Sequence, residues 1–312
     1  NDVGGAESDT ATFRAPVTLD AFAALRAAHP EARVLAGSTD VGLWVTKQMR
    51  QLGDLLYIGN VSELKRIERD ASMLTVGAAA SLEDAYAALV AEYPTLAEFA
   101  RRFASLPIRN AGTLGGNVAN GSPIGDSMPA LIALGAQVVL RRDKASRTLP
   151  LDAFYLGYQK TALEPGEFVA AIRVPLAHAQ LRFRTYKVSK RYDQDISAVC
   201  GAFALEIDNG KIVSARIAFG GMAATPQRAA AAEAALAGAA WNEASAQRAM
   251  DALAQDFVPL TDMRASSSYR MTVARNLLWR FHLETREEAP LAAGQVEAFS
   301  FEHSACPARE MP

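Results

Sequence analysis

Residues 108–136, which read IRNAGTLGGNVANGSPIGDSMPALIALGA, constrain the fold more than any other part of this 312-residue chain. Five glycines, together with Asn117 and Asn120, lie ahead of an apolar helical run that opens near Met128. Glycine accepts positive φ and close approach of another backbone, so successive N–H groups can form a concave anion site suited to a nucleotide pyrophosphate. The segment matches neither GxGxxG nor GxxxxGK[ST], and on these residues alone a glycine-rich turn remains the alternative.

Two other motifs accompany this segment. VLAGSTDV occupies residues 34–41, and DMRASSSYR occupies residues 262–270, ahead of VARNLL at 273–278. Together with RNAGTLGGN at 109–117 and SPIGD at 122–126, they resemble the flavin-binding domain of the molybdenum hydroxylases, and most closely that of the xanthine dehydrogenases. The motifs follow the order of that family, and the resemblance covers residues 12 to 285.

The resemblance and the hydrophobic patterns together predict an α+β fold. We expect a two-lobed PCMH-type FAD-binding domain followed by a C-terminal α+β domain in which helices cover one face of a sheet. The expected boundaries are 1–11 for a linker from a missing iron–sulfur region, 12–65 for lobe 1, 66–178 for lobe 2, 179–285 for the C-terminal domain and 286–312 for a tail.

Apolar periodicity predicts the main elements within these regions. Residues 198–207 and 211–219 flank Asp208-Asn209-Gly210 as the strands of a hairpin. The glycine-rich segment is expected to be a loop. Helices are expected at 82–92, 96–105, 128–134, 227–237, 242–255 and 267–283.

The resemblance implies a FAD site that has no catalytic side chain and no metal ligand of its own. Phe103 would stack on the flavin ring, Lys187 would stabilise negative charge on the reduced ring, and Asp126 would hydrogen-bond a ribose hydroxyl or loop amides. From the residues alone, Phe103 is also compatible with a core aromatic, Lys187 with a solvated strand lysine and Asp126 with a helix N-cap. The predicted FAD-binding residues are Val34, Leu35, Ala36, Gly37, Ser38, Thr39, Asp40, Val41, Phe103, Thr113, Gly116, Asn117, Asn120, Ser122, Asp126, Val169 and Lys187.

Composition argues against several other classes of protein. A net charge of -2 gives no electrostatic case for nucleic acid or an anionic membrane as a partner. No apolar run approaches the roughly 18 residues of a membrane span. Cys200 and Cys306 are far apart and match no metal or iron–sulfur spacing, and the four histidines match no ligand pattern either. We therefore expect a buried, inert thiol at Cys200 and a cytoplasmic protein.

The activity implied by the resemblance is an electron relay. A large molybdenum-cofactor subunit would hydroxylate xanthine or hypoxanthine, [2Fe–2S] clusters in an upstream iron–sulfur region would carry single electrons, and FAD in this chain would pass them to NAD. The implied assembly is a heterotetramer of two small and two large subunits. Two alternatives stay open: a flavoprotein subunit of carbon monoxide dehydrogenase or another molybdenum hydroxylase, and a non-catalytic FAD-binding assembly module.

Overall fold

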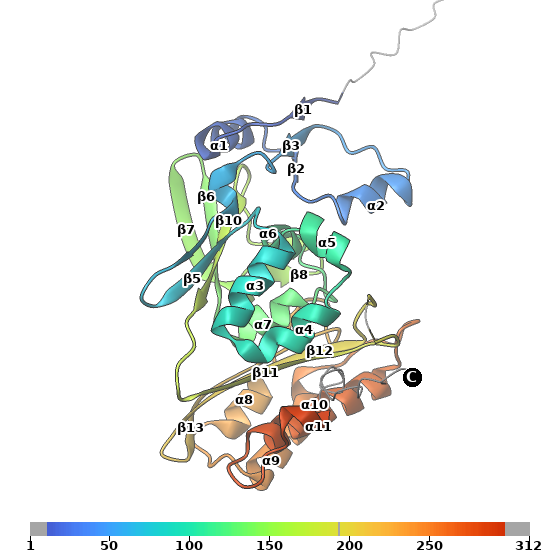
Figure 1. Ribbon diagram of the computed structural model, residues 1–312. Helices are drawn as coiled ribbons and strands as arrows, with labels where there is room; N and C mark the ends of the chain where they lie inside the picture. Colours follow the sequence, from blue (N-terminus) through green and yellow to red (C-terminus); the bar gives the residue numbers. More distant parts are fainter. Residues whose placement is uncertain (1–10, 193, 297–312) are drawn as a thin grey trace, which may run out of the picture.

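The computed structural model describes residues 11–192 and 194–296 (Figure 1). The first lobe is built on a small parallel sheet in which β3 (Leu55–Tyr57) lies between β1 (Phe13–Arg14) and β2 (Arg33–Leu35). Two helices belong to this lobe, α1 (Leu19–Ala28) and α2 (Val41–Thr46). Thr18 caps the N-terminus of α1, because its hydroxyl accepts a hydrogen bond from the Ala21 N–H at 3.2 Å.

The second lobe carries a five-stranded antiparallel sheet with short helices packed against it. The strand order is β4 (Ile67–Arg69), β5 (Met73–Gly77), β10 (Phe168–Pro175), β6 (Gln137–Arg142) and β7 (Ala145–Pro150). A two-stranded ribbon, β8 (Tyr155–Gly157) and β9 (Lys160–Thr161), follows β7. The helices are α3 (Leu82–Glu92), α4 (Ala97–Arg102), α5 (Leu106–Ala111), α6 (Leu114–Asn120) and α7 (Ser127–Ala133), with 3-10 turns η2 (Pro94–Leu96) and η3 (Leu151–Ala153). The 3-10 turn η1 (Ser62–Lys65) precedes β4, and its Leu64 packs in the core of the first lobe.

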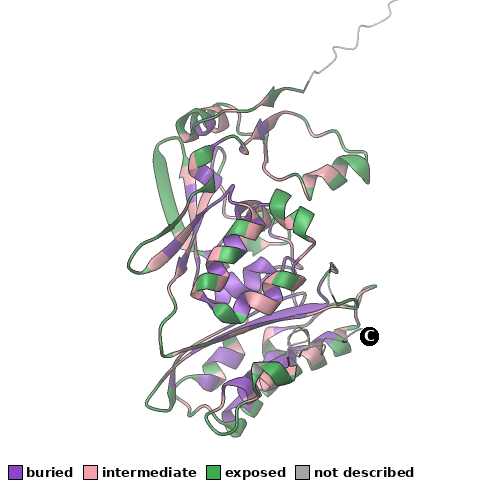
Figure 2. Cartoon of the chain, in the orientation of Figure 1, coloured by how far each residue is buried: buried purple, intermediate pink, exposed green. Residues whose placement is uncertain are grey.

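The C-terminal domain is an antiparallel sheet with long helices on one face. Its strands run in chain order, β11 (Leu181–Val188), β12 (Val199–Asp208), β13 (Lys211–Gly220) and β14 (Gln227–Arg228). Helices α8 (Ala230–Leu236), α9 (Glu243–Asp256) and α10 (Ser267–Thr285) cover the lower face in Figure 1, and α11 (Ala293–Val296) follows them. The upper face packs against α7, so the central strands are buried on both sides (Figure 2).

The predicted fold class is confirmed, with local differences that have physical reasons. The hairpin forms as expected, because Asn209 and Gly210 both adopt the positive φ that a tight hairpin turn needs. The glycine-rich segment contains a helix, α6, because the Thr113 hydroxyl caps it. The helix expected at 227–237 starts later, because Gln227 and Arg228 pair with β13. Helix α4 stops at Arg102, and Phe103 lies beyond it in extended backbone.

The predicted domain boundaries stay predictions. The sheets are compatible with them, because the strands of the first lobe end at Tyr57, those of the second lobe at Pro175, and those of the C-terminal domain begin at Leu181. Part of the expected linker and most of the expected tail, residues 1–10 and 297–312, lie outside the described residues.

Direct contacts between the second lobe and the C-terminal domain hold α7 in place. The Arg216 guanidinium donates to the carbonyl of Ile132 through Nε at 3.0 Å and Nη2 at 2.9 Å. A cation at the end of a helix satisfies its last carbonyls and complements its dipole. The Gly221 N–H donates to the Pro123 carbonyl at 2.7 Å. The segment that precedes α7 is therefore tied to the end of β13.

We expect His282 to make the stability of the C-terminal domain depend on pH. Its ring packs between Trp241 and Trp279, at centroid distances of 5.1 and 5.2 Å, and its Nδ1 is buried without a hydrogen-bond partner among the described residues. Burial, aided by Arg286, lowers the pKa of His282. An unfolded histidine titrates near pH 6.5, so below that pH the unfolded state binds the proton first. Stability is then lost as the pH falls from about 6.5 through the lower folded pKa.

We expect His282→Phe to remove this loss of stability at low pH. Urea unfolding at pH 7.5 and pH 5.5 would measure the difference in the free energy of unfolding. The matched control is His178→Gln, because the His178 side chain is exposed and its polar partners, Glu206 and Gln180, are at least partly exposed. Equal losses of stability between the two pH values in His282→Phe and in the unsubstituted protein would contradict the assignment.

Candidate functional site

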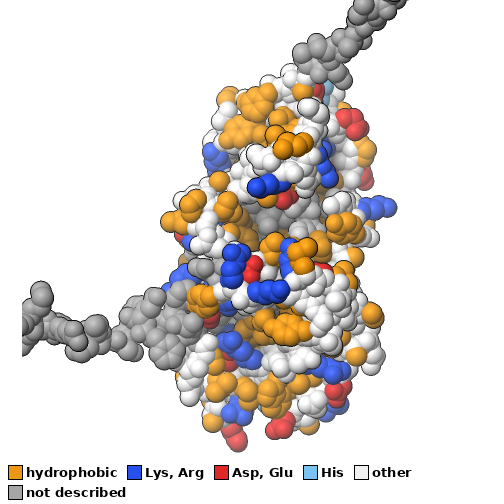
Figure 3. Space-filling model, turned by 90° about the vertical axis from the view of Figure 1, so that its right-hand side faces the viewer, with side chains coloured by type: hydrophobic (Ala, Val, Ile, Leu, Met, Phe, Trp, Pro, Cys, Tyr) orange, Lys and Arg blue, Asp and Glu red, His pale blue; other side chains and the backbone are white. Residues whose placement is uncertain are grey.

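A cleft of about 650 Å³ lies between the first and second lobes. Its size is in the range of small-molecule and cofactor sites. Four basic and three acidic side chains line it, so it is polar without a strong excess of either charge. The face of the molecule seen in Figure 3 is hollowed below the first lobe, with Lys and Arg side chains beside the hollow. The predicted FAD-binding residues that line the cleft are Val34, Ala36, Gly37, Ser38, Thr39, Asp40, Val41, Thr113, Gly116, Asn117, Asn120 and Val169.

The turn after β2 presents a row of free donors to this cleft. Within the described residues, the backbone N–H groups of Gly37, Ser38, Thr39 and Asp40 have no hydrogen-bond acceptor. Ser38 has a φ of 61°, and a left-handed residue within such a turn makes successive N–H groups converge. Gly37 packs so closely on Ala111 that a β-carbon would overlap the carbonyl there. The turn has the chemistry of an anion site.

The glycine-rich segment contributes differently from the sequence expectation. The N–H of Gly116 is taken by the Thr113 hydroxyl at 3.0 Å, and that of Gly115 by the Ala78 carbonyl at 3.1 Å. These two amides therefore do not belong to an open anion nest, and Gly115 instead allows α6 to pack on the Ala78 backbone. Asn117 does face the cleft, and its buried Oδ1 has no hydrogen-bond partner among the described residues. A buried polar atom of this kind needs a donor, which a bound ligand can supply.

The rim of the cleft includes residues that sequence reasoning missed. Trp44 lies between two arginines, with the Arg33 guanidinium 4.5 Å and the Arg50 guanidinium 5.4 Å from its ring centre. All three line the cleft, as do Arg26 and Lys160. Trp44 follows the predicted motif by three positions, which is less than one helical turn. This proximity is the sequence feature that could have identified Trp44 as a site residue. The arginines come from separate segments, so no local pattern brings them together.

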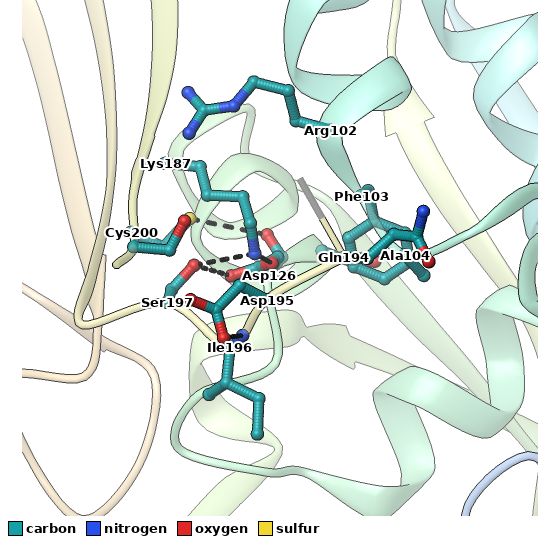
Figure 4. A network of polar contacts seen from close by, with 12 residues as sticks. Arg102, Phe103, Ala104, Asp126, Lys187, Gln194, Asp195, Ile196, Ser197 and Cys200 are labelled. Carbon is teal, nitrogen blue, oxygen red and sulfur yellow. Dashed lines mark hydrogen bonds and ion pairs between the residues drawn. The ribbon is translucent and has the colours of Figure 1, made fainter. Parts of the chain in front are cut away.

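A second cluster surrounds Asp126 and lies outside the residues that line the cleft (Figure 4). The Lys187 ammonium pairs with Asp126 Oδ2 and donates to Ser197 Oγ at 3.1 Å, and the Ser197 hydroxyl donates to Asp126 Oδ1 at 2.5 Å. The Lys187 and Asp126 side chains are 1% and 7% exposed. Charges this deep persist only when they are paired and hydrogen-bonded.

This cluster corrects two interpretations made from the residues alone. Lys187 is not a solvated strand lysine, since it is buried. Asp126 stands at the N-cap position of α7 but makes no side-chain capping bond, because its carboxylate is committed to Lys187 and Ser197. Next to the pair, burial and the Asp126 charge raise the pKa of the Cys200 thiol, so this cysteine is buried and protonated as expected.

Phe103 lies in the core of the second lobe. It is 7% exposed and packs against Tyr86 and Phe99, at centroid distances of 5.3 and 6.4 Å. In Figure 4 it lies to one side of the Asp126–Lys187 pair. The two other predicted residues outside the cleft lining have local roles: Leu35 pairs with Tyr57 in the sheet, and the Ser122 hydroxyl accepts from the Ile124 N–H at 3.4 Å.

Comparison with known proteins assigns the family. Residues 9–177 match the family described as the FAD binding domain in molybdopterin dehydrogenase, and residues 184–285 match the CO dehydrogenase flavoprotein C-terminal domain. The chain belongs to the FAD-binding subunits of the molybdenum hydroxylases. Among the described residues, no helix is long and apolar enough to cross a membrane, and no His, Cys, Asp and Glu side chains gather into a group that could hold a metal.

Relatives of several substrate types are about equally similar to this molybdenum hydroxylase subunit. The carbon monoxide dehydrogenase medium chain of Hydrogenophaga pseudoflava is 32% identical over 86% of this chain and 94% of its own length. The xanthine dehydrogenase FAD-binding subunit of Escherichia coli O157:H7 is 28% identical over 92% of this chain and 98% of its own length. A solved carbon monoxide dehydrogenase from Hydrogenophaga pseudoflava, 31% identical, superposes with a TM-score of 0.81 over 86% of this chain and 95% of that chain.

Some relatives are much longer. The xanthine dehydrogenase of Emericella nidulans is 30% identical over 86% of this chain, but only 21% of its own length is covered. The chain thus spans about a fifth of that protein.

Proposed function

We propose that this chain binds FAD in the cleft between its two lobes and serves as the flavin-carrying part of a xanthine dehydrogenase. The observation that carries the proposal is the row of N–H donors without acceptors at residues 37–40, which faces the same cleft as the unpartnered Oδ1 of Asn117. A dinucleotide supplies what both lack, since its pyrophosphate accepts hydrogen bonds and its ribose hydroxyls donate them.

Each group of residues has a distinct part in this proposal. The turn at 37–41 donates to the pyrophosphate, Asn117 accepts from a hydroxyl, and Val34, Ala36 and Val169 provide apolar walls. Phe103, Asp126 and Lys187 are proposed to border the flavin ring, with the buried Lys187 charge favouring negative charge on the reduced ring. When bound, FAD supplies the chemistry of accepting and donating electrons in pairs or singly, and no side chain here needs to act as an acid or base.

The proposed route of electrons extends beyond this chain. Xanthine or hypoxanthine would be hydroxylated at a molybdenum-cofactor subunit, [2Fe–2S] clusters in an upstream region would carry the electrons to FAD, and NAD would receive them. The proposed setting is a cytoplasmic hetero-oligomer of two small and two large subunits. The residues of the motifs at 34–41 and 109–126 support the assignment to the xanthine dehydrogenases, and so does the presence of xanthine dehydrogenases among the relatives.

A second candidate is a flavoprotein subunit of carbon monoxide dehydrogenase or of another molybdenum hydroxylase. The similarity to the Hydrogenophaga pseudoflava medium chain favours it, because its 32% identity is at least as high as the 30% and 28% of the Emericella nidulans and Escherichia coli xanthine dehydrogenases. Co-purification of the native complex, followed by assays with xanthine and with carbon monoxide, separates the two. A complex that oxidises carbon monoxide and leaves xanthine unchanged would replace the first candidate by the second.

The purified chain should carry one non-covalent FAD, because its donors are backbone amides and no cysteine or histidine lines the cleft within the described residues. Denaturation should release all of the flavin into the supernatant, where its absorbance measures the stoichiometry. With NADH the bound flavin should reduce an artificial dye. A colourless protein that cannot be loaded with FAD would refute FAD binding, flavin retained on the precipitate would refute the non-covalent mode, and flavin without dye reduction would favour the assembly module.

A further inference from the structure

The third sequence motif, residues 262–270, does not line the cleft, yet it ends in one of the most deeply buried side chains of the chain. Arg270, on α10, is 1% exposed. Its Nη1 donates to the carbonyls of Ala198 and of Gly221, the latter at 2.8 Å, and its Nη2 donates to Asp262 Oδ1 at 2.7 Å. One guanidinium therefore joins three segments that are far apart in the sequence.

Two of these segments converge on Asp126. Ala198 directly follows Ser197, whose hydroxyl donates to Asp126 Oδ1 at 2.5 Å and accepts from Lys187. Gly221 is bonded to the segment that leads to Asp126, because its N–H donates at 2.7 Å to the carbonyl of Pro123, three residues before Asp126. Arg270 thus bonds one segment that supplies a partner of the Asp126 carboxylate and another that is bonded to the backbone just before Asp126.

Asp262 holds Arg270 in this position. Its carboxylate also accepts the N–H groups of Arg264 at 2.8 Å and Ala265 at 3.1 Å. Burial acts to raise the pKa of Asp262, but these hydrogen bonds and the Arg270 charge outweigh it and lower the pKa. Asp262 is consequently ionised at neutral pH. The next carbonyl, of Met263, accepts from the Lys190 ammonium at 2.8 Å, which ties the motif to the loop that leads to Ser197.

Burial of an arginine is expensive for a domain that only needs a filled core. An apolar side chain of similar volume would often stabilise such a position as well or better. What a guanidinium adds is a planar, rigid fork of donors that sets where its acceptors lie. Here two of the three acceptors are the main-chain carbonyls of Ala198 and Gly221, which lie in segments bonded to the Asp126 network. Fixing these two carbonyls therefore restricts where the side chains of the network can lie.

We propose that Arg270, held by Asp262, is a positioning residue that sets the orientation of the Asp126–Lys187–Ser197 network toward the flavin. The inference rests on the proposed function, because it takes this network to border the ring. It assigns a role to the third motif, which contributes nothing to the cleft itself. Arg270 acts through Ala198 and Gly221 and is not placed against the flavin.

The test uses the full chain with Arg270→Met, and Arg275→Met as the matched control, since Arg275 lies on the same helix but donates to Met250 on the α9 side. Hydrogen exchange of the flavin-free protein should rise at least about tenfold at residues 122–126 and 195–199 in Arg270→Met and stay unchanged in the control. In the FAD-loaded protein, the ratio of reduced to oxidised FAD affinity should fall about tenfold, because the Lys187 charge is no longer held in place. A lowered flavin midpoint potential reports this ratio directly.

The outcomes separate the inference from the proposed function. An unsubstituted chain that binds no FAD overturns the proposed function and the inference with it. An unsubstituted chain that binds FAD, with exchange and midpoint potential unchanged in Arg270→Met, overturns the inference alone. If Arg270→Met does not fold, Asp262→Asn replaces it. This variant keeps the side-chain volume and the two carbonyl contacts of Arg270, and it should change exchange and potential in the same direction by a smaller factor, whereas no change would equally overturn the inference.

Discussion

Replacing Lys187 with methionine is expected to lower the free energy of unfolding by about 3 to 5 kcal/mol. The substitution leaves the Asp126 carboxylate buried, with the Ser197 hydroxyl as its remaining side-chain donor among the described residues. Removing one member of a buried ion pair is costly because the other charge stays desolvated without compensation. Urea unfolding followed by tryptophan fluorescence would measure the loss.

Two further variants decide whether the missing charge is the cause. Lys187→Met combined with Asp126→Leu removes both charges and should recover most of the lost stability, since a buried pair can be replaced by apolar groups at little cost. Lys190→Met is the matched control, because this lysine loses an exposed hydrogen bond to the Met263 carbonyl rather than a buried ion pair, and stability should change by less than about 1 kcal/mol. A double variant as unstable as Lys187→Met would show that packing, rather than charge, is responsible.

Gly37→Ala is expected to weaken FAD binding by about 1 to 3 kcal/mol, or roughly 5- to 160-fold in Kd. A β-carbon at this position overlaps the Ala111 carbonyl, so the turn that carries the free amides must move. Fluorescence titration with FAD, together with unfolding of the flavin-free protein, separates loss of binding from loss of stability.

Gly42→Ala is the control for the loss of FAD binding, because Gly42 lies in α2, directly after the turn that contains Gly37. Nothing lies within 4 Å of a β-carbon there, and alanine is the better helix former. This variant should bind FAD normally and gain up to about 1 kcal/mol of stability. If Gly37→Ala binds FAD as tightly as Gly42→Ala, the turn at 37–40 is not where the pyrophosphate is held.

Much of the fold could be predicted because its signals are local. The alternating strand pattern and the Asn209-Gly210 turn specify the β12–β13 hairpin, and Thr18 and Asn242 mark helix starts by the bonds that their own side chains make. The first motif was likewise informative, because Gly37 and its neighbours form a turn that lines the cleft. Where a prediction failed locally, as at residues 227–228, pairing with a distant strand overrode helix propensity.

The family and the fold class follow from the sequence, since both depend on residue type and on spacing within a few positions. Which side chains of the candidate site contact one another depends on the tertiary structure. Asp126 contacts Lys187 and Ser197, which are 61 and 71 residues away in the sequence, and Arg270 donates to Ala198, which is 72 residues away. The two arginines that contact Trp44 come from separate segments on either side of it. A buried charge takes whichever partner the packing of distant elements brings to it, and no local pattern records that choice.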